Sequence, residues 1–229
     1  MSKGKFIVID GSDGSGKKTQ ADILIGRLKE AGHDIAYYDF PQYYDTFFGK
    51  MVGEFLTGKF GEAQNADPYL ASLPYAGDRW QASDKIKKDL AAGKIVISNR
   101  YTSSNMAHQA GKISDIAKKD EYLHWLEELE FNVYNIPKPD LVLYLFVPLE
   151  ISQALLETKE QRQYVGKKAK DSVESDVNYL ANSINEYLRL VDKYPDWKKI
   201  DCTINGRIDS IESIGKKVFE IVKKELEKL

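Results

Sequence analysis

The sequence predicts an α/β fold in which helices cover both faces of a parallel sheet of about five strands. Short apolar runs alternate with longer amphipathic stretches along the 229 residues, a pattern typical of such a sheet. The predicted strands are Phe6–Asp10, Ile35–Phe40, Ile95–Ser98, Leu141–Val147 and Lys199–Cys202. The predicted helices span about 17–31, 45–57, 67–92, 118–132, 149–158, 171–193 and 209–228. No repeat, low-complexity tract or linker interrupts this order, so we expect one domain over residues 1–229.

Glycine and aspartate mark several of the predicted helix ends. Gly32, Gly93 and Gly206 each follow a helical stretch, at the position where a residue in the left-handed conformation commonly ends a helix. Asp115 and Asp209 each precede a helical stretch, and we expect them to cap the first turn.

Composition and charge exclude several classes of protein. The net charge is −2, so no overall basic field indicates nucleic acid as a partner. No apolar run approaches the ~20 residues of a membrane span, and no secretory leader precedes the first strand. The single cysteine, Cys202, cannot form an intramolecular disulfide and suits a reducing compartment. We therefore expect a cytoplasmic protein that binds neither nucleic acid nor membrane.

A glycine-rich stretch directly follows the first strand. A strand, a glycine-rich turn, a lysine and a helix form the order that a phosphate-binding loop requires. Backbone N–H groups and the helix N-terminus would surround a polyphosphate, and Lys17 would reach its outer phosphates. The hydroxyl that normally follows the lysine arrives one residue late, because Lys18 precedes Thr19. A turn that only caps the helix is the alternative. The predicted phosphate-binding residues are Gly11, Ser12, Asp13, Gly14, Ser15, Gly16, Lys17, Lys18 and Thr19.

The ends of the second and third strands carry a second set of candidate residues. Ligands of open α/β sheets bind beyond the carboxyl ends of the strands. Residues 39–43 and 98–109 follow those ends, and residues 75–80 precede the third strand. These segments bring Arg79, Arg100, several aromatic rings and Asn105 toward the phosphate loop. Arginine matches phosphate and aromatic rings stack on bases, so we expect a second phosphorylated substrate with a base.

A cationic segment spans about 158–171. Such a run is often only a solvated surface. In a chain with a phosphate-binding loop, it can instead act as a lid that neutralises charge and excludes water. An arginine matches a transferring phosphoryl group better than a lysine. The candidates for the mobile lid cation are Arg162, Lys167, Lys168 and Lys170.

Taken together, these motifs resemble the thymidylate kinase family, within the nucleoside monophosphate kinases of the P-loop superfamily. Each motif is short, but their joint order and spacing are specific. In chain order they are the loop with Asp13, Phe-Pro-x-Tyr at 40–43, aromatic-x-x-Asp-Arg at 75–79, Arg-Tyr at 100–101, Ser-Asn-x-x-His at 104–108, Pro-x-Pro-Asp-Leu at 137–141, the basic segment, and Asp171 with Glu174.

The resemblance implies a three-layer P-loop sandwich with a short basic lid, and transfer of the ATP γ-phosphoryl to dTMP with Mg²⁺. Lys17, Arg100 and the lid cations would act in transfer, since Gly14 and Ser15 leave no mobile cation in the loop. Asp13 would face the sugar, Tyr75 would stack on thymine, and His108 would lie near the sugar. Tyr75 and His108 also fit structural roles, and Asp171 and Glu174 also fit charges at a helix N-terminus. The implied dTMP-binding residues are Asp13, Phe40, Pro41, Tyr43, Tyr75, Arg79, Arg100, Ser104, Asn105, His108, Asp171 and Glu174.

Three positions depart from the pattern that the resemblance implies. Many members have an arginine where this chain has Gln42. Lys18 replaces the hydroxyl of the strict P-loop pattern, and a lysine or arginine at that position does occur within the family. Many also have an aspartate, placed to organise magnesium and the acceptor phosphate, where this chain has Asn99. Asn99 is therefore the candidate on the metal side. An asparagine keeps the shape of an aspartate but lacks its negative charge. Three explanations stay open: weakened catalysis, altered metal binding and an engineered substitution.

The resemblance implies a dTMP kinase in dTTP synthesis that uses ATP as donor. Three alternatives stay open: a kinase for another deoxynucleotide, a deoxynucleoside kinase with a carboxylate base, and a nucleotide-binding homologue weakened at Asn99 and Gln42. The family is commonly homodimeric. The apolar positions of the predicted helices 67–92 and 118–132 would serve either a dimer interface or the core.

Overall fold

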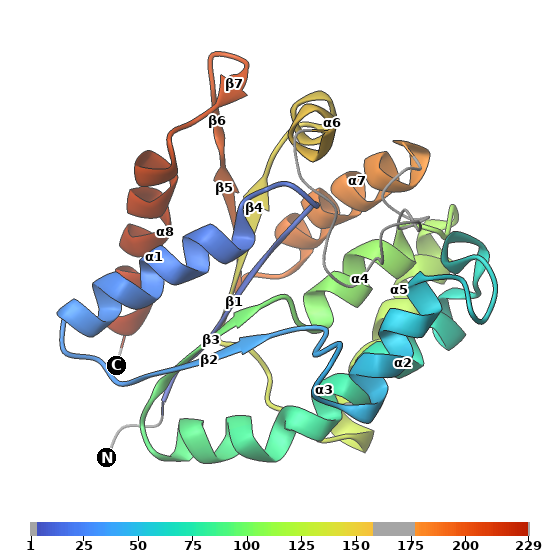
Figure 1. Cartoon of the computed structure of the whole chain (residues 1–229), viewed down its shortest axis with the longest axis horizontal. Helices are drawn as coiled ribbons and strands as arrows, with labels where there is room; N and C mark the ends of the chain where they lie inside the picture. The colour runs from blue at the N-terminus through green and yellow to red at the C-terminus, as the bar shows by residue number, and fades with distance from the viewer. Residues whose placement is uncertain (1–3, 158–176, 229) are drawn as a thin grey trace.

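Five parallel strands form the central sheet of the molecule (Figure 1). The computed structural model describes residues 4–157 and 177–228. The order across the sheet is β2-β3-β1-β4-β5, and every neighbouring pair is parallel, which confirms the predicted fold class. Only the fifth strand differs notably from its predicted range, because it begins two residues earlier. The strands are β1 (Phe6–Gly11), β2 (Ile35–Asp39), β3 (Ile95–Asn99), β4 (Leu141–Phe146) and β5 (Trp197–Asp201).

Helices cover both faces of the sheet, as the apolar strands require. Successive strand residues point to opposite faces, so Phe6 and Val8 belong to one core cluster while Ile7 and Ile9 belong to the other. The cluster of Ile7 and Ile9 lies under α1 (Lys17–Glu30) and α8 (Ile211–Leu226). The opposite cluster lies under α3 (Pro68–Ala91), α4 (Thr102–Ala110), α5 (Ile116–Glu127) and α7 (Val177–Lys193).

The remaining short elements lie around the carboxyl ends of the strands. Helix α2 (Phe47–Leu56) packs on α3, and a 3₁₀ turn, η1 (Ala63–Asn65), leads into α3. Helix α6 (Leu149–Glu157) follows β4. No helix within the described ranges is long and apolar enough to cross a bilayer.

Two helical segments differ from the prediction. Helix α4 was not predicted, because its sequence is short and mostly polar. The helix predicted over 118–132 is present, but α5 (Ile116–Glu127) continues without a break into a π-helical turn, η2 (Glu128–Val133), in place of regular α-helix. A single π turn leaves no period in the sequence that reveals it, although such turns often occur at functional sites.

The glycine predictions are confirmed at two positions and wrong at the third. Gly32 and Gly93 have φ values of 87° and 81° and directly follow Ala31 and Ala92, the C-cap residues of α1 and α3. Gly206 does not end a helix. With Asn205 it forms the left-handed turn (φ 50° and 73°) of a hairpin between β6 (Thr203–Ile204) and β7 (Arg207–Ile208). Asn-Gly is a strong hairpin signal, but the flanking strands are too short to show alternation.

Of the two predicted aspartate caps, only Asp115 is confirmed. Its carboxylate accepts a hydrogen bond from the Lys118 backbone N–H at 2.9 Å. The prediction for Asp209 is wrong, because Ser210 caps α8 by accepting from the Ser213 N–H at 3.1 Å. Asp209 supports the same turn from one residue earlier, where its carboxylate accepts from the Ser213 hydroxyl at 2.7 Å.

Candidate active site

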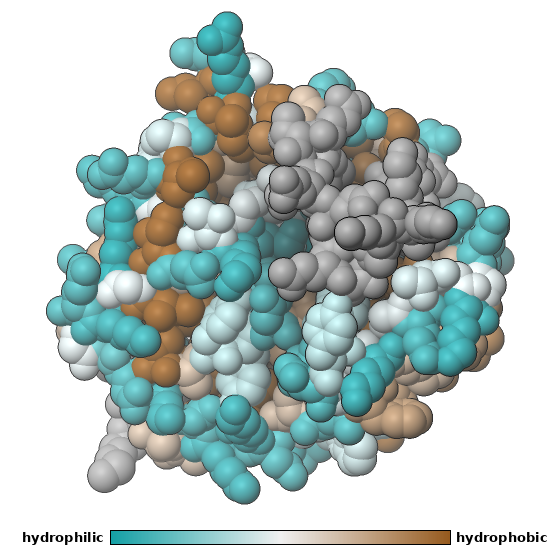
Figure 2. Space-filling model, viewed as in Figure 1, coloured by the Kyte–Doolittle hydropathy of each residue, from teal (hydrophilic) through white to brown (hydrophobic). Residues whose placement is uncertain are grey.

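A cavity of about 400 Å³ opens at the carboxyl ends of the strands, a volume typical of small-molecule sites. Figure 2 shows a hollow with hydrophilic walls near the centre of this face. Of the predicted site residues that the structure describes, Gly11, Ser12 and Ser15 do not line the cavity. Those that do are Asp13, Gly14, Gly16, Lys17, Lys18, Thr19, Phe40, Pro41, Tyr43, Tyr75, Arg79, Asn99, Arg100, Ser104, Asn105 and His108.

Sequence reasoning missed several residues in the cavity wall. Asp39 stands at the end of β2, next to residues that were predicted, and Tyr101 follows Arg100 directly. Tyr179 comes from α7, far along the chain, and no local motif marks it. The missed lining residues are Asp39, Leu56, Asp78, Tyr101, Gln109 and Tyr179.

The phosphate loop closes tightly over the end of β1. A Cβ at Gly11 would lie 2.7 Å from the Leu145 carbonyl oxygen, so only glycine fits there. The Lys17 ammonium folds back over the loop and donates to the carbonyl oxygens of Gly11 (3.0 Å) and Ser12 (2.9 Å). It also lies 3.9 Å from Asp13 Oδ1. This arrangement places the lysine charge at the inner wall of the cavity.

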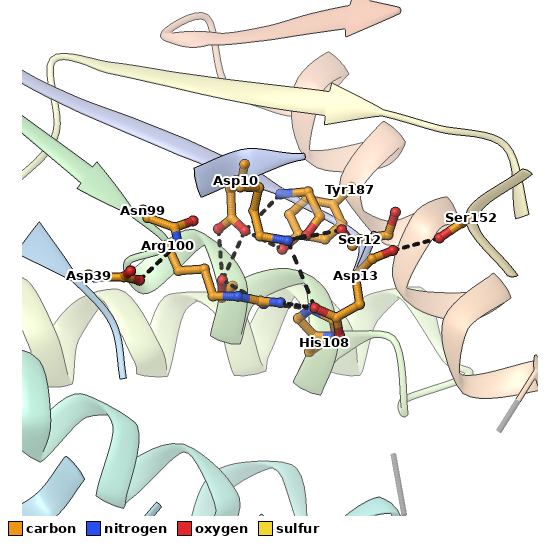
Figure 3. A network of polar contacts seen from close by, with 12 residues as sticks. Asp10, Ser12, Asp13, Asp39, Asn99, Arg100, His108, Ser152 and Tyr187 are labelled. Atoms are coloured by element: carbon orange, nitrogen blue, oxygen red, sulfur yellow. Dashed lines mark hydrogen bonds and ion pairs between the residues drawn. The ribbon is translucent and has the colours of Figure 1, made fainter. Parts of the chain in front are cut away.

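A buried carboxylate, Asp10, joins the loop to two helices (Figure 3). It accepts hydrogen bonds from the hydroxyls of Ser103 (2.6 Å), Ser104 (2.8 Å) and Tyr187 (2.8 Å), and from the Gly11 N–H (2.8 Å). Burial first, and then the Asp10 charge, raise the pKa of Tyr187, so its hydroxyl stays a donor. The only sequence signal of this network is an acid inside an apolar strand. Asp10 thus fixes α4 and α7 against the start of the phosphate loop.

Arg100 enters the cavity from a strained turn. Its φ is 64°, which is uncommon for a residue with a side chain and often occurs at functional sites. Its N–H donates to the Ile9 carbonyl at 2.9 Å, and the Ser98 hydroxyl donates to its carbonyl at 2.6 Å. The guanidinium pairs with Asp13 through Nη2 (Figure 3). The turn therefore aims the arginine across the mouth of the phosphate loop.

His108 lies beside Arg100 and is neutral near pH 7. Burial and the Arg100 charge lower the pKa of His108 to about 4. Its Nε2 lies 3.4 Å from Arg100 Nη1, and its ring stacks on Tyr179 at 5.7 Å between centroids. The neutral ring can therefore accept from a donor without adding positive charge.

Arg79 lines the cavity but is largely occupied by an acid that sequence reasoning missed. Its Nε and Nη2 each donate to Glu130 at 2.6 Å, and both side chains are buried. The Thr102 hydroxyl also donates to Glu130, at 2.8 Å. Only Nη1 is less tightly held, at 3.4 Å from the Tyr101 carbonyl. Arg79 therefore presents one edge of its guanidinium rather than the whole fork.

The aromatic candidate Tyr75 and the amide candidate Asn105 come from α3 and α4. The ring of Tyr75 meets Phe55 edge-on at 6.5 Å, in a small cluster between α2 and α3. Asn105 is buried, and its Nδ2 donates to the Ser72 carbonyl at 3.3 Å. Both line the cavity, so one wall offers a ring face and an amide.

Asn99 and Asp39 form the remaining polar pair at this edge. Asn99 Nδ2 donates to Asp39 Oδ1 at 2.8 Å, and the Tyr37 hydroxyl donates to Asp39 Oδ2 at 3.2 Å. Desolvation raises the pKa of the Asp39 carboxyl, and these bonds together with the charges of Lys18 and Arg100 oppose the rise. Asn99 Oδ1 is buried and has no hydrogen-bond partner in the parts of the chain described. These oxygens suit a hard cation such as Mg²⁺.

Six predicted residues cannot be placed. The basic segment and the acidic pair that follows it fall outside the described residues. They are Arg162, Lys167, Lys168, Lys170, Asp171 and Glu174.

Comparison with known proteins identifies the family of this fold and cavity. Residues 9–208 match the family model described as thymidylate kinase. A probable thymidylate kinase of Thermococcus onnurineus is 31% identical over 227 residues, with 96% of this chain and 98% of the relative covered. A thymidylate kinase of Mycobacterium tuberculosis is 31% identical over 171 residues, with 75% and 78% covered.

A solved structure agrees with these relatives. The thymidylate kinase of Candida albicans matches with a TM-score of 0.72 at 26% identity, covering 98% of this chain and 93% of that chain. The family-model match, residues 9–208, begins within β1 and runs through the hairpin after β5, so it includes the phosphate loop and every described wall of the cavity. The chain belongs to the thymidylate kinase family.

Proposed function

We propose that this protein transfers the γ-phosphoryl group of ATP to the 5′-phosphate of dTMP, giving ADP and dTDP for dTTP synthesis. The observation that carries the proposal is the position of the cavity. It opens directly beside a phosphate-binding loop, and Arg100 and several aromatic rings line its walls. A cavity of this kind suits two phosphorylated substrates held end to end, with a base on the aromatic side.

On the donor side, the loop of residues 11–19 binds the ATP phosphates. Gly11 gives the close turn, and the N–H groups at the start of α1 face the anion. Lys17 exchanges its contacts with the Gly11 and Ser12 carbonyls for phosphate oxygens when the nucleotide enters. That exchange is favourable because an ammonium bonds more strongly to a charged oxygen.

On the acceptor side, Arg100 binds the phosphate of dTMP and Asp13 faces its sugar. The existing pair between these two residues orients the guanidinium before the substrate arrives. Tyr75, Asn105 and the open edge of Arg79 contact the base. The residues that line the pocket around the monophosphate are Phe40, Pro41, Tyr43, Ser104 and His108.

The chemistry requires alignment and charge neutralisation rather than a general base, because a phosphate monoester is already largely ionised near neutral pH. Lys17 and Arg100 hold the two anions in line and spread the developing charge. A Mg²⁺ ion bound with ATP would supply further neutralisation of phosphate charge. Asn99 and Asp39 are the oxygen-bearing side chains on that side. The mobile cation comes from Arg162, Lys167, Lys168 or Lys170, and Asp171 and Glu174 complete the acceptor site.

The protein acts as a cytoplasmic homodimer. Support for the dimer comes from apolar side chains exposed on one face of α3, namely Leu70, Leu73 and Trp80, with Phe47 on the adjacent α2. The stripe expected on 118–132 does not serve, because Tyr122, Leu123 and Leu126 are buried in the core. Static light scattering of the whole chain tests the dimer. The buried free thiol of Cys202 suits the reducing cytoplasm.

A nucleotide panel tests the reaction. With ATP and Mg²⁺, ADP release is measured for dTMP, dUMP, dCMP and thymidine. We expect dTMP to give the highest kcat/KM and thymidine to give none. Turnover of thymidine instead of dTMP would indicate a deoxynucleoside kinase. Binding of dTMP in calorimetry without ADP release would indicate a catalytically weakened homologue. The dUMP arm is informative because the Candida albicans enzyme is described as having broad substrate specificity.

A further inference from the structure

Asp39 and Asn99 end neighbouring strands and stand opposite each other. They are register partners in the parallel pair of β2 and β3, at the carboxyl edge of the sheet. Their side chains therefore project from the same side of that edge, and Asn99 Nδ2 reaches Asp39 Oδ1 at 2.8 Å. Both residues line the cavity, and Figure 3 shows their side chains meeting at this edge of the sheet.

The hydrogen bond fixes which way the Asn99 amide points. A carboxylate only accepts hydrogen bonds, so the amide must turn its NH₂ group toward Asp39 and its oxygen away. Asn99 is 9% exposed, and Oδ1 is buried without a partner in the described chain. A buried oxygen without a donor is unfavourable, so this atom points to a ligand that supplies positive charge or a proton.

Asp39 supplies the negative charge that residue 99 lacks. The Tyr37 hydroxyl at 3.2 Å and Asn99 hold its two oxygens in place. The pair therefore offers one fixed carboxylate and one buried amide oxygen in the wall of the cavity.

We infer that Asp39, positioned by Asn99, is the carboxylate that this chain presents to the divalent cation accompanying the nucleotide. The inference rests on the proposed function, because the cation arrives with ATP. Oxygen ligands of this type suit Mg²⁺, which commonly keeps part of its water shell and meets protein through one or two carboxylates. In this chain the acidic residue stands at the end of β2, next to the position in β3 where many family members carry an aspartate.

Nucleotide affinity with and without metal tests this assignment. Calorimetry measures binding of the β,γ-imido analogue of ATP in Mn²⁺ and in EDTA, for the wild type and for Asp39→Asn. We expect Asp39→Asn to lose about tenfold of the metal-dependent gain in affinity. Binding in EDTA stays equal or tightens, because a negative charge facing the phosphates is gone. A purely structural role would instead weaken binding in both conditions, and that result would overturn the inference.

Two further variants sharpen the test. Asp22→Asn is the matched control, since Asp22 also lies near Lys18 but outside the cavity wall. We expect this variant to show the same metal-dependent gain in nucleotide affinity as the wild type. The exchange Asp39→Asn with Asn99→Asp returns a carboxylate to the pair, and we expect it to recover most of the gain. The inference would be overturned if metal increased the nucleotide affinity of Asp39→Asn as much as that of the wild type, or if metal did not increase the affinity of the wild type. ADP release with dTMP by the wild type judges the proposed function separately.

Discussion

Arg79 donates two hydrogen bonds, each 2.6 Å long, to the carboxylate of Glu130 across the buried interface between α3 and η2. The pair joins positions 51 residues apart and includes the only acid of η2 whose side chain is fully buried. Its geometry explains why an arginine that lines the cavity keeps one edge for a ligand while remaining fixed in the protein interior.

The first prediction concerns the stability that depends on this pair. Glu130→Gln leaves the Arg79 charge buried without its counter-ion, which typically costs about 3 kcal/mol or more in unfolding free energy. Urea unfolding monitored by circular dichroism measures it. The control is Glu227→Gln, because Glu227 forms an exposed pair with Lys223 at 3.9 Å, and we expect no measurable change. An equal loss of unfolding free energy in both variants would contradict the conclusion that the buried pair matters more to stability than the exposed pair.

The second prediction concerns Lys17. Lys17→Ala removes the ammonium at the inner wall of the loop, and we expect kcat for dTMP phosphorylation to fall at least about 100-fold, as for other lost transition-state donors. A coupled assay of ADP release measures it. Lys29→Ala, at the exposed end of the same helix, should keep wild-type kcat. Near-normal turnover of Lys17→Ala would refute the donor site.

The third prediction compares one substitution at two helical glycines. A Cβ at Gly77 in α3 would lie 2.6 Å from the Phe48 ring, whereas a Cβ at Gly26 in α1 meets nothing within 4 Å. Gly77→Ala should therefore destabilise the protein by about 1–3 kcal/mol through overpacking. Gly26→Ala should stabilise it by about 0.5–1 kcal/mol through helix propensity. Thermal and urea unfolding measure both, and the same sign for both would contradict the α2–α3 packing.

The fourth prediction concerns pH. The pKa of His108 is lowered to about 4 in the folded protein, while an unfolded histidine titrates near 6.5. Between these values the unfolded chain binds the extra proton, so the free energy of unfolding falls as pH drops from about 6.5 to 4. His108→Asn should reduce that loss. Urea unfolding at pH 7 and pH 4.5 measures it, with His33→Asn, on the exposed turn after α1, as the control that keeps the wild-type slope.

The sequence predicts those residues of the candidate site that lie in linear motifs or at strand ends. The placement of the glycine-rich loop and Arg100 beside one cavity could be predicted because parallel strands deliver their carboxyl ends to one edge. Glu130, Tyr179 and the role of Asp10 could not, since each depends on a partner from a distant element. Helix α4 was too short and polar for a periodic signal. Asp39 was visible beside Phe40, but only its contact with Asn99 gives it significance.

The two described helices that precede and follow residues 158–176 in the chain, α6 and α7, are hydrogen-bonded to the phosphate loop and to the strand residue just before it. On α6, the Ser152 hydroxyl donates to the Asp13 carbonyl at 2.7 Å, and on α7, the Tyr187 hydroxyl donates to Asp10 at 2.8 Å (Figure 3). The two acceptors, Asp10 and Asp13, lie only three residues apart in the chain, so α6 and α7 are both held at the point where β1 passes into the phosphate loop.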